Sequence, residues 1–340
     1  GPETTPNTLH WFKWEAYTTW ISGFALLVIV YYFGASAFLI DPSVMMLNPS
    51  TAIAFGIAFI FGGLAIYELA CRSPLAKMPK LFGLFIVCFI TFACWLSSFM
   101  FSGRGAFIHV GALVGTIMAG NVLFGIMPAQ RKMVAAVTQK QKVNPAWGLG
   151  AKLRSVHNNY FTLPLLFIMI SNHYPIVYQH QYNWLVLTLF IAISAWIRHF
   201  FNLKHLGIVK PSILVSGAIM MASLTLWISW PQESNNHNAL ILEEPSAMKI
   251  NESLSASEKE VLTIIQTRCV SCHSSQPTDE IFKVAPLGVK YDTWFDIQRY
   301  ASQIYNRSSV TKDMPLLNKS KMTEQERQQL AVWFTNRKEK

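Results

Sequence analysis

Two cysteines and a histidine in the last third of the chain form its clearest chemical motif. They lie in the run Cys269-Val270-Ser271-Cys272-His273, which has the spacing C-x-x-C-H. Two thiols at this spacing can both reach the vinyl groups on one porphyrin edge, and the adjacent histidine then meets the iron. A thioredoxin-like site would need a β-α-β setting, and a zinc site would need a second Cys or His pair, which the following 67 residues lack. The motif therefore predicts one covalently bound c-type haem.

The second axial ligand of the haem iron should come from the chain after His273. No histidine follows, so a methionine thioether is the natural ligand, and only Met314 and Met322 qualify. Met314 lies in an irregular run, whereas Met322 directly precedes a helix cap at Thr323. We predict that Met314 binds the iron, where a thioether raises the reduction potential, and that Met322 packs in the core. We also expect the Pro286 carbonyl to orient the His273 ring.

Two helices are predicted to bracket this motif. Ser257 and Glu260 have capping-box spacing and precede an amphipathic helix that ends at the motif. Thr323 and Glu326 have the same spacing before a second helix. The predicted domains are a membrane domain, a linker and a cytochrome c domain, residues 1–231, 232–256 and 257–340.

The first two thirds of the chain are too apolar for a soluble domain. Over the whole chain 52% of residues are hydrophobic and 14% charged, whereas about a quarter of a soluble domain is charged. Crossing a bilayer takes about 20 apolar residues, and seven runs qualify. The predicted spans are approximately residues 20–40, 50–70, 82–101, 105–127, 160–178, 184–201 and 212–230. The expected fold class is all-α: a polytopic helical membrane bundle of seven spans with a C-terminal, class I-like cytochrome c domain.

Basic residues are distributed unevenly along the chain. Residues 1–231 contain 14 Lys and Arg against 4 Asp and Glu, while residues 232–340 contain 14 of each. The excess lies in connectors 71–81, 128–159 and 202–211, which the positive-inside rule assigns to the cytoplasm. No groove-reading motif is visible, so the charge indicates membrane topology rather than a nucleic-acid partner. We predict a bacterial inner (cytoplasmic) membrane protein with a periplasmic cytochrome domain, where c-type haem is attached.

Polar residues at membrane depth indicate a second task, because a cytochrome that needs only an anchor would use one span. The far-side group, at the predicted periplasmic end, consists of Arg104, His109, Asn172 and His173. The near-side group, at the cytoplasmic end, consists of Asn121, Arg154, His157, Asn158, Asn159, Arg198, His199, Asn202 and His205. The arginines could instead be interface anchors, and the connector histidines could be solvated. Two histidines on facing spans could also bind a b-type haem, although no clean pair is identifiable.

Five separate runs of the chain share a pattern with one family. They are His10–Glu15, Phe101–Arg104, Arg154–Tyr160, Ser171–Pro175 and Arg198–Asn202. The pattern resembles the membrane-bound bacterial urate hydroxylases (urate oxidases), which fuse an integral-membrane catalytic domain to a cytochrome c. The resemblance implies oxidation of urate to 5-hydroxyisourate in purine catabolism, with electrons passing through the cytochrome to a periplasmic or membrane acceptor of the respiratory chain. Members of that family begin with another apolar span, so the resemblance also implies a truncated form or a fragment.

Urate is a flat anion with several carbonyl and N–H groups. Arg supplies a fixed fork of donors, Asn both donates and accepts, and His can take a proton. Both polar groups contain these residue types, but a cytoplasmic site would need an intermediate carrier across about 30 Å of hydrocarbon. The predicted catalytic residues are Arg104, His109, Asn172 and His173. The alternative group, or route of access, is Arg154, His157, Asn158, Arg198 and His199.

Two other functions remain open on the sequence alone. The chain could be an electron-transfer subunit, a membrane-anchored cytochrome c that serves another membrane dehydrogenase or quinol and has no substrate of its own. It could also be a transporter with a redox-sensing tail. Reduction of the haem by urate without oxygen is expected for the enzyme only.

Overall fold

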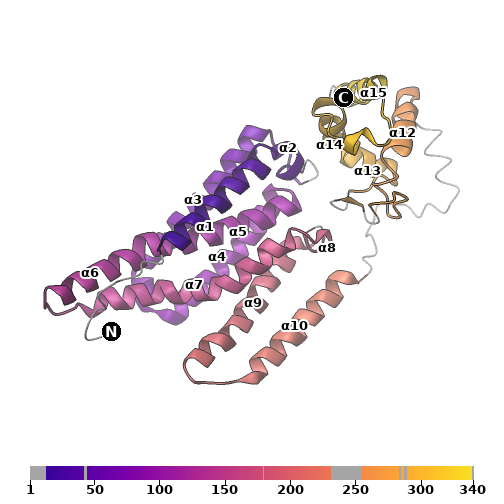
Figure 1. The fold of residues 1–340 in the computed structure, drawn as a ribbon. Coiled ribbons are helices and arrows are strands. Elements are labelled where there is room, and N and C mark those ends of the chain that lie inside the picture. Colours follow the sequence, from indigo (N-terminus) through magenta and orange to yellow (C-terminus); the bar gives the residue numbers. More distant parts are fainter. Residues whose placement is uncertain are drawn as a thin grey trace. The chain divides into compact units, whose positions relative to one another are not determined.

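The computed structural model describes residues 13–41, 44–178, 180–230, 254–282, 285–286 and 289–338. Throughout this part of the chain the regular elements are all helical, as the sequence predicts (Figure 1). The chain forms two compact units, Gly1–Ile228 and Ser229–Lys340. Most of the predicted linker, residues 232–253, lies outside the described residues, as does the run His10–Phe12 of the family pattern.

Five helices of the N-terminal unit are long and apolar enough to cross a membrane. One of them is continuous over residues 103–138 and joins α5 (Gly103–Gly120) to α6 (Met127–Thr138) through a π-helical turn (Asn121–Ile126). The other four are α3 (Pro49–Arg72), α4 (Pro79–Met100), α9 (Asn183–His205) and α10 (Pro211–Ser229). The unit therefore belongs to a multi-pass membrane protein.

Two of the seven predicted spans are not among these five helices. The run 20–40 falls on α1 (Lys13–Leu27), a π-helical turn (Val28–Tyr32) and α2 (Ala35–Phe38). The run 160–178 falls on α7 (Pro145–Ser171) and α8 (Pro175–Tyr178). Helix α7 is long enough to cross, but the polar run from Lys152 to Asn159 interrupts its apolar character. Seven crossings therefore stay a prediction.

Helix α5 is the most buried of the candidate spans and packs against α1, α3, α4 and α7 (Figure 1). Small residues allow this close packing. A β-carbon at Gly111 of α5 would lie 2.8 Å from Ile168 of α7, and one at Gly63 of α3 would lie 2.5 Å from Leu113. His109 and Thr116 of α5 are thereby buried among these helices, whereas Arg104 in its first turn is half-buried.

The C-terminal unit is built on α12 (Ala256–Arg268) and α15 (Glu324–Lys338), which pack against each other. Between them lie α13 (Trp294–Arg299), α14 (Ala301–Ile304) and a π-helical turn (Tyr305–Val310). Ile265, Ile297 and Leu330 are fully buried in the shared core.

The two predicted helix caps have different outcomes. The Thr323 and Glu326 box is confirmed, because the Thr323 N–H donates to the Glu326 carboxylate at 2.7 Å and the Glu326 N–H donates to the Thr323 hydroxyl at 3.2 Å. The box predicted at Ser257 and Glu260 is wrong by two residues, since Ser255 and Glu258 form it. Both serines have the required spacing, and the earlier cap adds further hydrogen-bonded residues to the helix.

Candidate functional site

The far-side group centres on Arg104, in the first turn of α5. Ser102 caps this helix, and its hydroxyl donates to the Phe38 carbonyl at 2.7 Å, which fixes the start of α5 against α2. Arg104 Nε donates to Asn172 Oδ1 at 2.7 Å, and the Tyr31 hydroxyl donates to the same oxygen at 2.9 Å. The guanidinium also lies 5.8 Å and 5.2 Å from the ring centroids of Tyr31 and Phe38, within cation–π range.

Arg104 keeps an unneutralised charge within the described part of the chain. The ion pairs found there all use other lysines and arginines. Its contacts are an amide oxygen and aromatic faces, and these carry no net negative charge. The guanidinium can therefore still attract an anion.

His109 lies farther along α5 and is completely buried. Its ring stacks on Phe101, with centroids 4.7 Å apart, and Tyr32 lies on another side at 5.8 Å. Nδ1 is 2.8 Å from the Gly105 carbonyl. Because a carbonyl only accepts, Nδ1 carries the proton of the neutral ring, and Nε2 keeps a lone pair.

Two unpartnered polar atoms meet beside this ring. His109 Nε2 and the Tyr32 hydroxyl are both buried and have no hydrogen-bond partner among the described residues. A β-carbon at Gly56 of α3 would lie 2.7 Å from Nε2 and 3.0 Å from the hydroxyl. Helices α3 and α5 and the turn after α1 thus bring a proton acceptor and a hydroxyl to one point.

The structure treats the two residues at the end of α7 differently. Asn172 accepts the hydrogen bond from Arg104 Nε. His173 lies in the turn that follows and is exposed. Of the four predicted catalytic residues, the structure therefore joins Arg104 to Asn172, places His109 deeper along the same helix as Arg104, and leaves His173 outside the cluster.

In the near-side group, Arg154 is already paired. Its two terminal nitrogens donate to the two carboxylate oxygens of Glu68 at 2.6 and 2.9 Å, and Arg72 donates to the same carboxylate at 2.7 Å. A β-carbon at Gly125 would overlap the Arg154 side chain, so only a glycine at this position leaves space for Arg154. The bidentate carboxylate leaves Arg154 little charge to offer an anionic ligand.

Side-chain amides and aromatic residues extend the hydrogen-bond network around Arg154. Asn121 accepts from Arg154 at 3.1 Å and donates to Asn158 at 2.8 Å and to the Tyr67 hydroxyl at 3.0 Å. The same hydroxyl lies 2.7 Å from His157 Nδ1. Helices α3 and α7 are thereby joined through Asn121, the first residue of the π-helical turn after α5.

The remaining near-side residues form a separate cluster on α7 and α9. Arg198 donates to Asn159 Oδ1 at 2.9 Å, and its Nε is buried without a partner among the described residues. His199 Nδ1 lies 2.6 Å from the Tyr160 hydroxyl. Two residues at the end of α9 stand apart: Asn202 is half-buried and His205 is exposed. The three histidines His109, His157 and His199 each lie against a tyrosine ring.

The C-x-x-C-H motif directly follows α12, and its histidine is held in a defined tautomer. His273 Nδ1 lies 2.9 Å from the Val289 carbonyl, so Nδ1 donates and Nε2 is available to a metal. The predicted partner, the Pro286 carbonyl, is wrong, because the Val289 carbonyl takes that place; the Pro286 carbonyl accepts the Val289 N–H at 3.1 Å in a local turn. Burial lowers the pKa of His273, which favours the neutral ring that metal binding requires.

The thiols of the motif are both unpaired. Burial raises the pKa of Cys269 to about 12 and raises that of Cys272 as well. Redox-active C-x-x-C sites depend instead on a lowered thiol pKa, so the environment does not suit thiol exchange. In the described part of the chain, no three His, Cys, Asp or Glu side chains gather as a zinc site would require. Two thiols beside a histidine with an available Nε2 fit a covalently bound haem.

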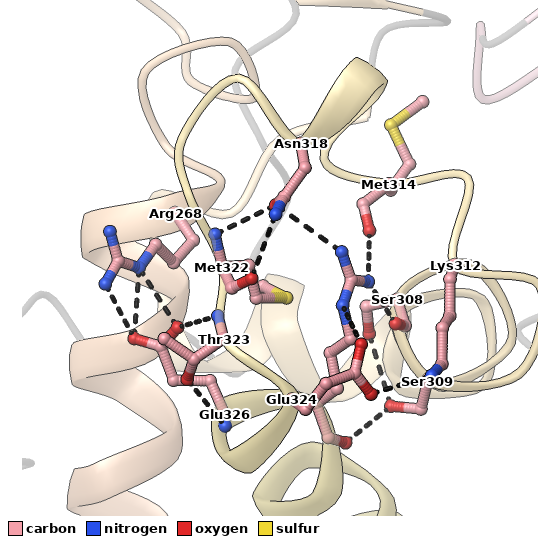
Figure 2. A network of polar contacts seen from close by, with 11 residues as sticks. Arg268, Ser308, Ser309, Lys312, Met314, Asn318, Met322, Thr323, Glu324 and Glu326 are labelled. Atoms are coloured by element: carbon pink, nitrogen blue, oxygen red, sulfur yellow. Dashed lines mark hydrogen bonds and ion pairs between the residues drawn. The ribbon is translucent and has the colours of Figure 1, made fainter.

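The two methionines lie in different surroundings. Met322 is 3% exposed and packs in the core of the C-terminal unit, as predicted. Met314 is half-buried in the loop before α15. Figure 2 shows its carbonyl directed at a network of polar contacts and its sulfur directed away from that network. Of the two methionines, only Met314 has a thioether that is not packed in the core and is therefore available to bind a metal.

Residues 1–229 match the family described as urate oxidase N-terminal. The chain belongs to this family. No curated protein and no solved structure matches it.

The urate oxidase N-terminal family match covers the whole membrane unit, including the far-side and near-side groups. It ends before the C-x-x-C-H motif. The family thus connects the membrane unit to urate, while the haem rests on the motif and its geometry.

Sequence reasoning missed several polar residues of this urate oxidase family member. Glu68 had a visible signal, because it is the one acidic residue within the predicted spans and such residues are functional candidates. Tyr31 and Tyr32 had none, since tyrosines are common near membrane interfaces. Both lie in a π-helical turn, and Asn121 begins another. Such turns gather at functional sites but have no simple sequence pattern.

Proposed function

We propose that this protein is a membrane-bound urate hydroxylase that oxidises urate to 5-hydroxyisourate and delivers the electrons to a c-type haem in its C-terminal unit. Membership in the urate oxidase N-terminal family supports the substrate, and the C-x-x-C-H motif supports the haem. In the reaction, water forms a new C–O bond to the purine ring, and two electrons and two protons leave. The enzyme must therefore bind an anion and provide a place for protons.

One observation carries the assignment of the site: helix α5 places an unneutralised guanidinium, Arg104, and a buried, unpartnered proton acceptor, His109 Nε2, on two residues that both lie against Tyr31, at 5.8 Å and 6.4 Å from its ring centroid. The guanidinium offers planar donors to the carbonyl oxygens and negative charge of urate. The oxygen of Asn172 already accepts from Arg104 and Tyr31, so its amide nitrogen remains to donate to a urate carbonyl.

His109 and Tyr32 suit the proton step. The Nε2 lone pair of His109 can accept a proton, and the adjacent Tyr32 hydroxyl can both donate and accept. Neither atom has another partner among the described residues. Burial and the stacked Phe101 ring exclude water from the imidazole, so its proton exchange would run through the hydroxyl or the substrate.

The near-side group fits urate binding less well. Glu68 satisfies Arg154 with two hydrogen bonds, which leaves Arg198 and Asn159 as the alternative donors. On the predicted topology, a site there would also need an intermediate carrier across about 30 Å of hydrocarbon. Cytoplasmic urate could still pass these residues on its way to the far side.

The chain's own residues define the proposed haem site. Cys269 and Cys272 would hold the porphyrin edge, His273 and Met314 would bind the iron, and the Val289 carbonyl orients the His273 ring. Once bound, the haem accepts electrons one at a time and passes them to a downstream periplasmic or membrane acceptor. Replacing both motif cysteines by Ala should remove acid-stable haem staining from the denatured polypeptide, and staining that persists would contradict this assignment.

The decisive experiment is anaerobic addition of urate to the oxidised, haem-loaded protein. Urate should reduce the haem of the parent protein, as followed by its visible spectrum. Arg104→Ala and His109→Ala should leave the haem reducible by dithionite but not by urate. Parent rates in both variants, together with loss in His199→Ala, would place the site in the near-side group. If urate fails to reduce the haem of the intact protein, the alternative function, an electron-transfer subunit without its own substrate, is favoured.

A further inference from the structure

The backbone N–H and the backbone carbonyl of Met314 are both hydrogen-bonded. Its N–H donates to the Arg307 carbonyl at 3.0 Å. Its own carbonyl accepts from Arg327 Nη1 at 2.7 Å, and Arg327 comes from α15. The backbone of Met314 is thus fixed by one contact from the preceding turn and one from a distant helix.

Arg327 is an unusual side chain for this position, because it is charged and only 5% exposed. Its nearest carboxylate among the described residues, Glu324, is 3.7 Å away and itself 74% exposed. Buried charges are normally paired, yet Arg327 directs its donors mainly at backbone carbonyls. Besides Met314 it bonds to the Ser308 carbonyl, while the Ser309 hydroxyl donates back to the Arg327 carbonyl at 2.8 Å.

The same side chain reaches the far end of the loop. Arg327 Nη2 lies 3.5 Å from Asn318 Oδ1, and Asn318 exchanges two hydrogen bonds with the backbone of Met322, at 2.9 and 3.1 Å (Figure 2). Four residues of this loop have left-handed backbone angles: Lys312, Leu317, Asn318 and Lys321. Since these conformations are unfavourable for side chains other than glycine, the loop needs tertiary contacts to keep its path.

We infer that Arg327 is a positioning residue for the Met314 thioether and thereby sets the reduction potential of the proposed haem. The inference rests on the proposed function, because it needs a haem bound at His273. An axial thioether raises the potential of a haem relative to stronger donors. Its iron bond is weak, so the bond depends on a loop that already presents the sulfur in place.

The test uses the full-length, haem-loaded protein with three variants. Arg327→Gln removes the charge and the fork of donors, and Arg327→Lys keeps the charge without the fork. Arg337→Gln is the matched control, because Arg337 lies on the same helix and donates to a backbone carbonyl, that of Gln298, at 2.7 Å. The readouts are covalent haem staining, the near-infrared sulfur-to-iron band, the midpoint potential and the affinity for added imidazole.

Both Arg327 variants should keep covalent haem. Arg327→Gln should lose the sulfur-to-iron band, bind imidazole more tightly and shift its potential towards that of Met314→Ala. Arg327→Lys should change in the same direction by less, and Arg337→Gln should match the parent. A parent band, potential and imidazole affinity in Arg327→Gln would overturn the inference, and so would equal changes in Arg337→Gln.

Arg327→Lys decides the matter if Arg327→Gln does not fold. Unchanged band, potential and imidazole affinity in that variant would then overturn the positioning role. Failure of the proposed function has a different signature. A parent protein without covalent haem would refute the haem site itself, and a haem that urate does not reduce would refute the enzyme while leaving the Met314 spectroscopy interpretable.

Discussion

Gly56 gives a sharp test of the proposed far-side site, because Gly56→Ala adds one methyl group beside two buried, unpartnered atoms, His109 Nε2 and the Tyr32 hydroxyl. The new carbon would lie 2.7 Å from His109 Nε2, about 0.7 Å short of the 3.4 Å at which ordinary contact begins. Phe101 stacks on the ring with centroids 4.7 Å apart, which hinders its retreat. Overpacking of this kind costs about 1–3 kcal/mol, and misplacing a reacting group by about 1 Å can cost about 100-fold in rate.

The assay is the anaerobic rate at which urate reduces the haem. We expect Gly56→Ala to lower this rate by about 10- to 100-fold and to leave reduction by dithionite unchanged. Gly62→Ala is the control, because Gly62 lies on the same helix and has no atom within 4 Å of the added carbon. Both variants add the same methyl group to α3, so only the contacts with the imidazole and the Tyr32 hydroxyl differ.

Two results would refute this reasoning. A parent rate in Gly56→Ala would show that the position of His109 does not matter for urate oxidation. An equal loss in Gly62→Ala would show that the effect belongs to α3 as a helix. Thermal unfolding of both variants in detergent separates these outcomes from general destabilisation.

Three further predictions concern the C-terminal unit and the topology. Met314→Leu should abolish the sulfur-to-iron band and lower the haem's reduction potential, because the thioether is lost, whereas Met322→Leu should change neither. Asp279→Asn should make the stability of the protein less dependent on pH in acid. Hydrogen bonds from a lysine and two backbone amides hold the pKa of the Asp279 carboxyl well below its usual range. The parent therefore loses stability as the pH falls from about 3.9, the pKa of an unfolded Asp, towards the lower pKa of the folded state. A reporter active only in the periplasm should work after Lys340 and fail in connector 128–159.

Each of these predictions has a clear contrary result. Loss of the band in Met322→Leu alone would mean that the other methionine binds the iron. A stability that depends on acid pH as steeply in Asp279→Asn as in the parent would show that this carboxyl does not govern acid unfolding. Reporter activity in connector 128–159 would invert the topology.

Local signals in the sequence anticipated much of the C-terminal unit. The motif spacing, the cap at Thr323 and the burial of Met322 each depend on a few neighbouring residues. The errors arose where two local solutions were equivalent. Ser255 and Ser257 both fit a capping box, and the choice of Val289 over Pro286 depends on a turn that only the folded backbone defines.

The membrane unit was harder to predict because its site depends on contacts between distant helices. Hydropathy located the apolar runs but could not show that Arg154 is matched by Glu68, 86 positions away. It also could not show that Tyr32 and Gly56 face His109. The sequence shows the residue types of the far-side group. Which charges and lone pairs have a partner is determined by how the helices pack, so it could not be predicted.

The ion pair of Glu68 and Arg154 has a consequence for how the protein is made. Helix α7 is not among the helices apolar enough to cross by composition alone, and Arg154 lies in its polar first half. Helix α3 is such a helix, and it is synthesised first. Once α3 has entered the bilayer, its carboxylate can receive both Arg154 nitrogens. Helix α7 would then enter alongside α3 rather than as an independent segment, and the order of synthesis would guide the order of assembly.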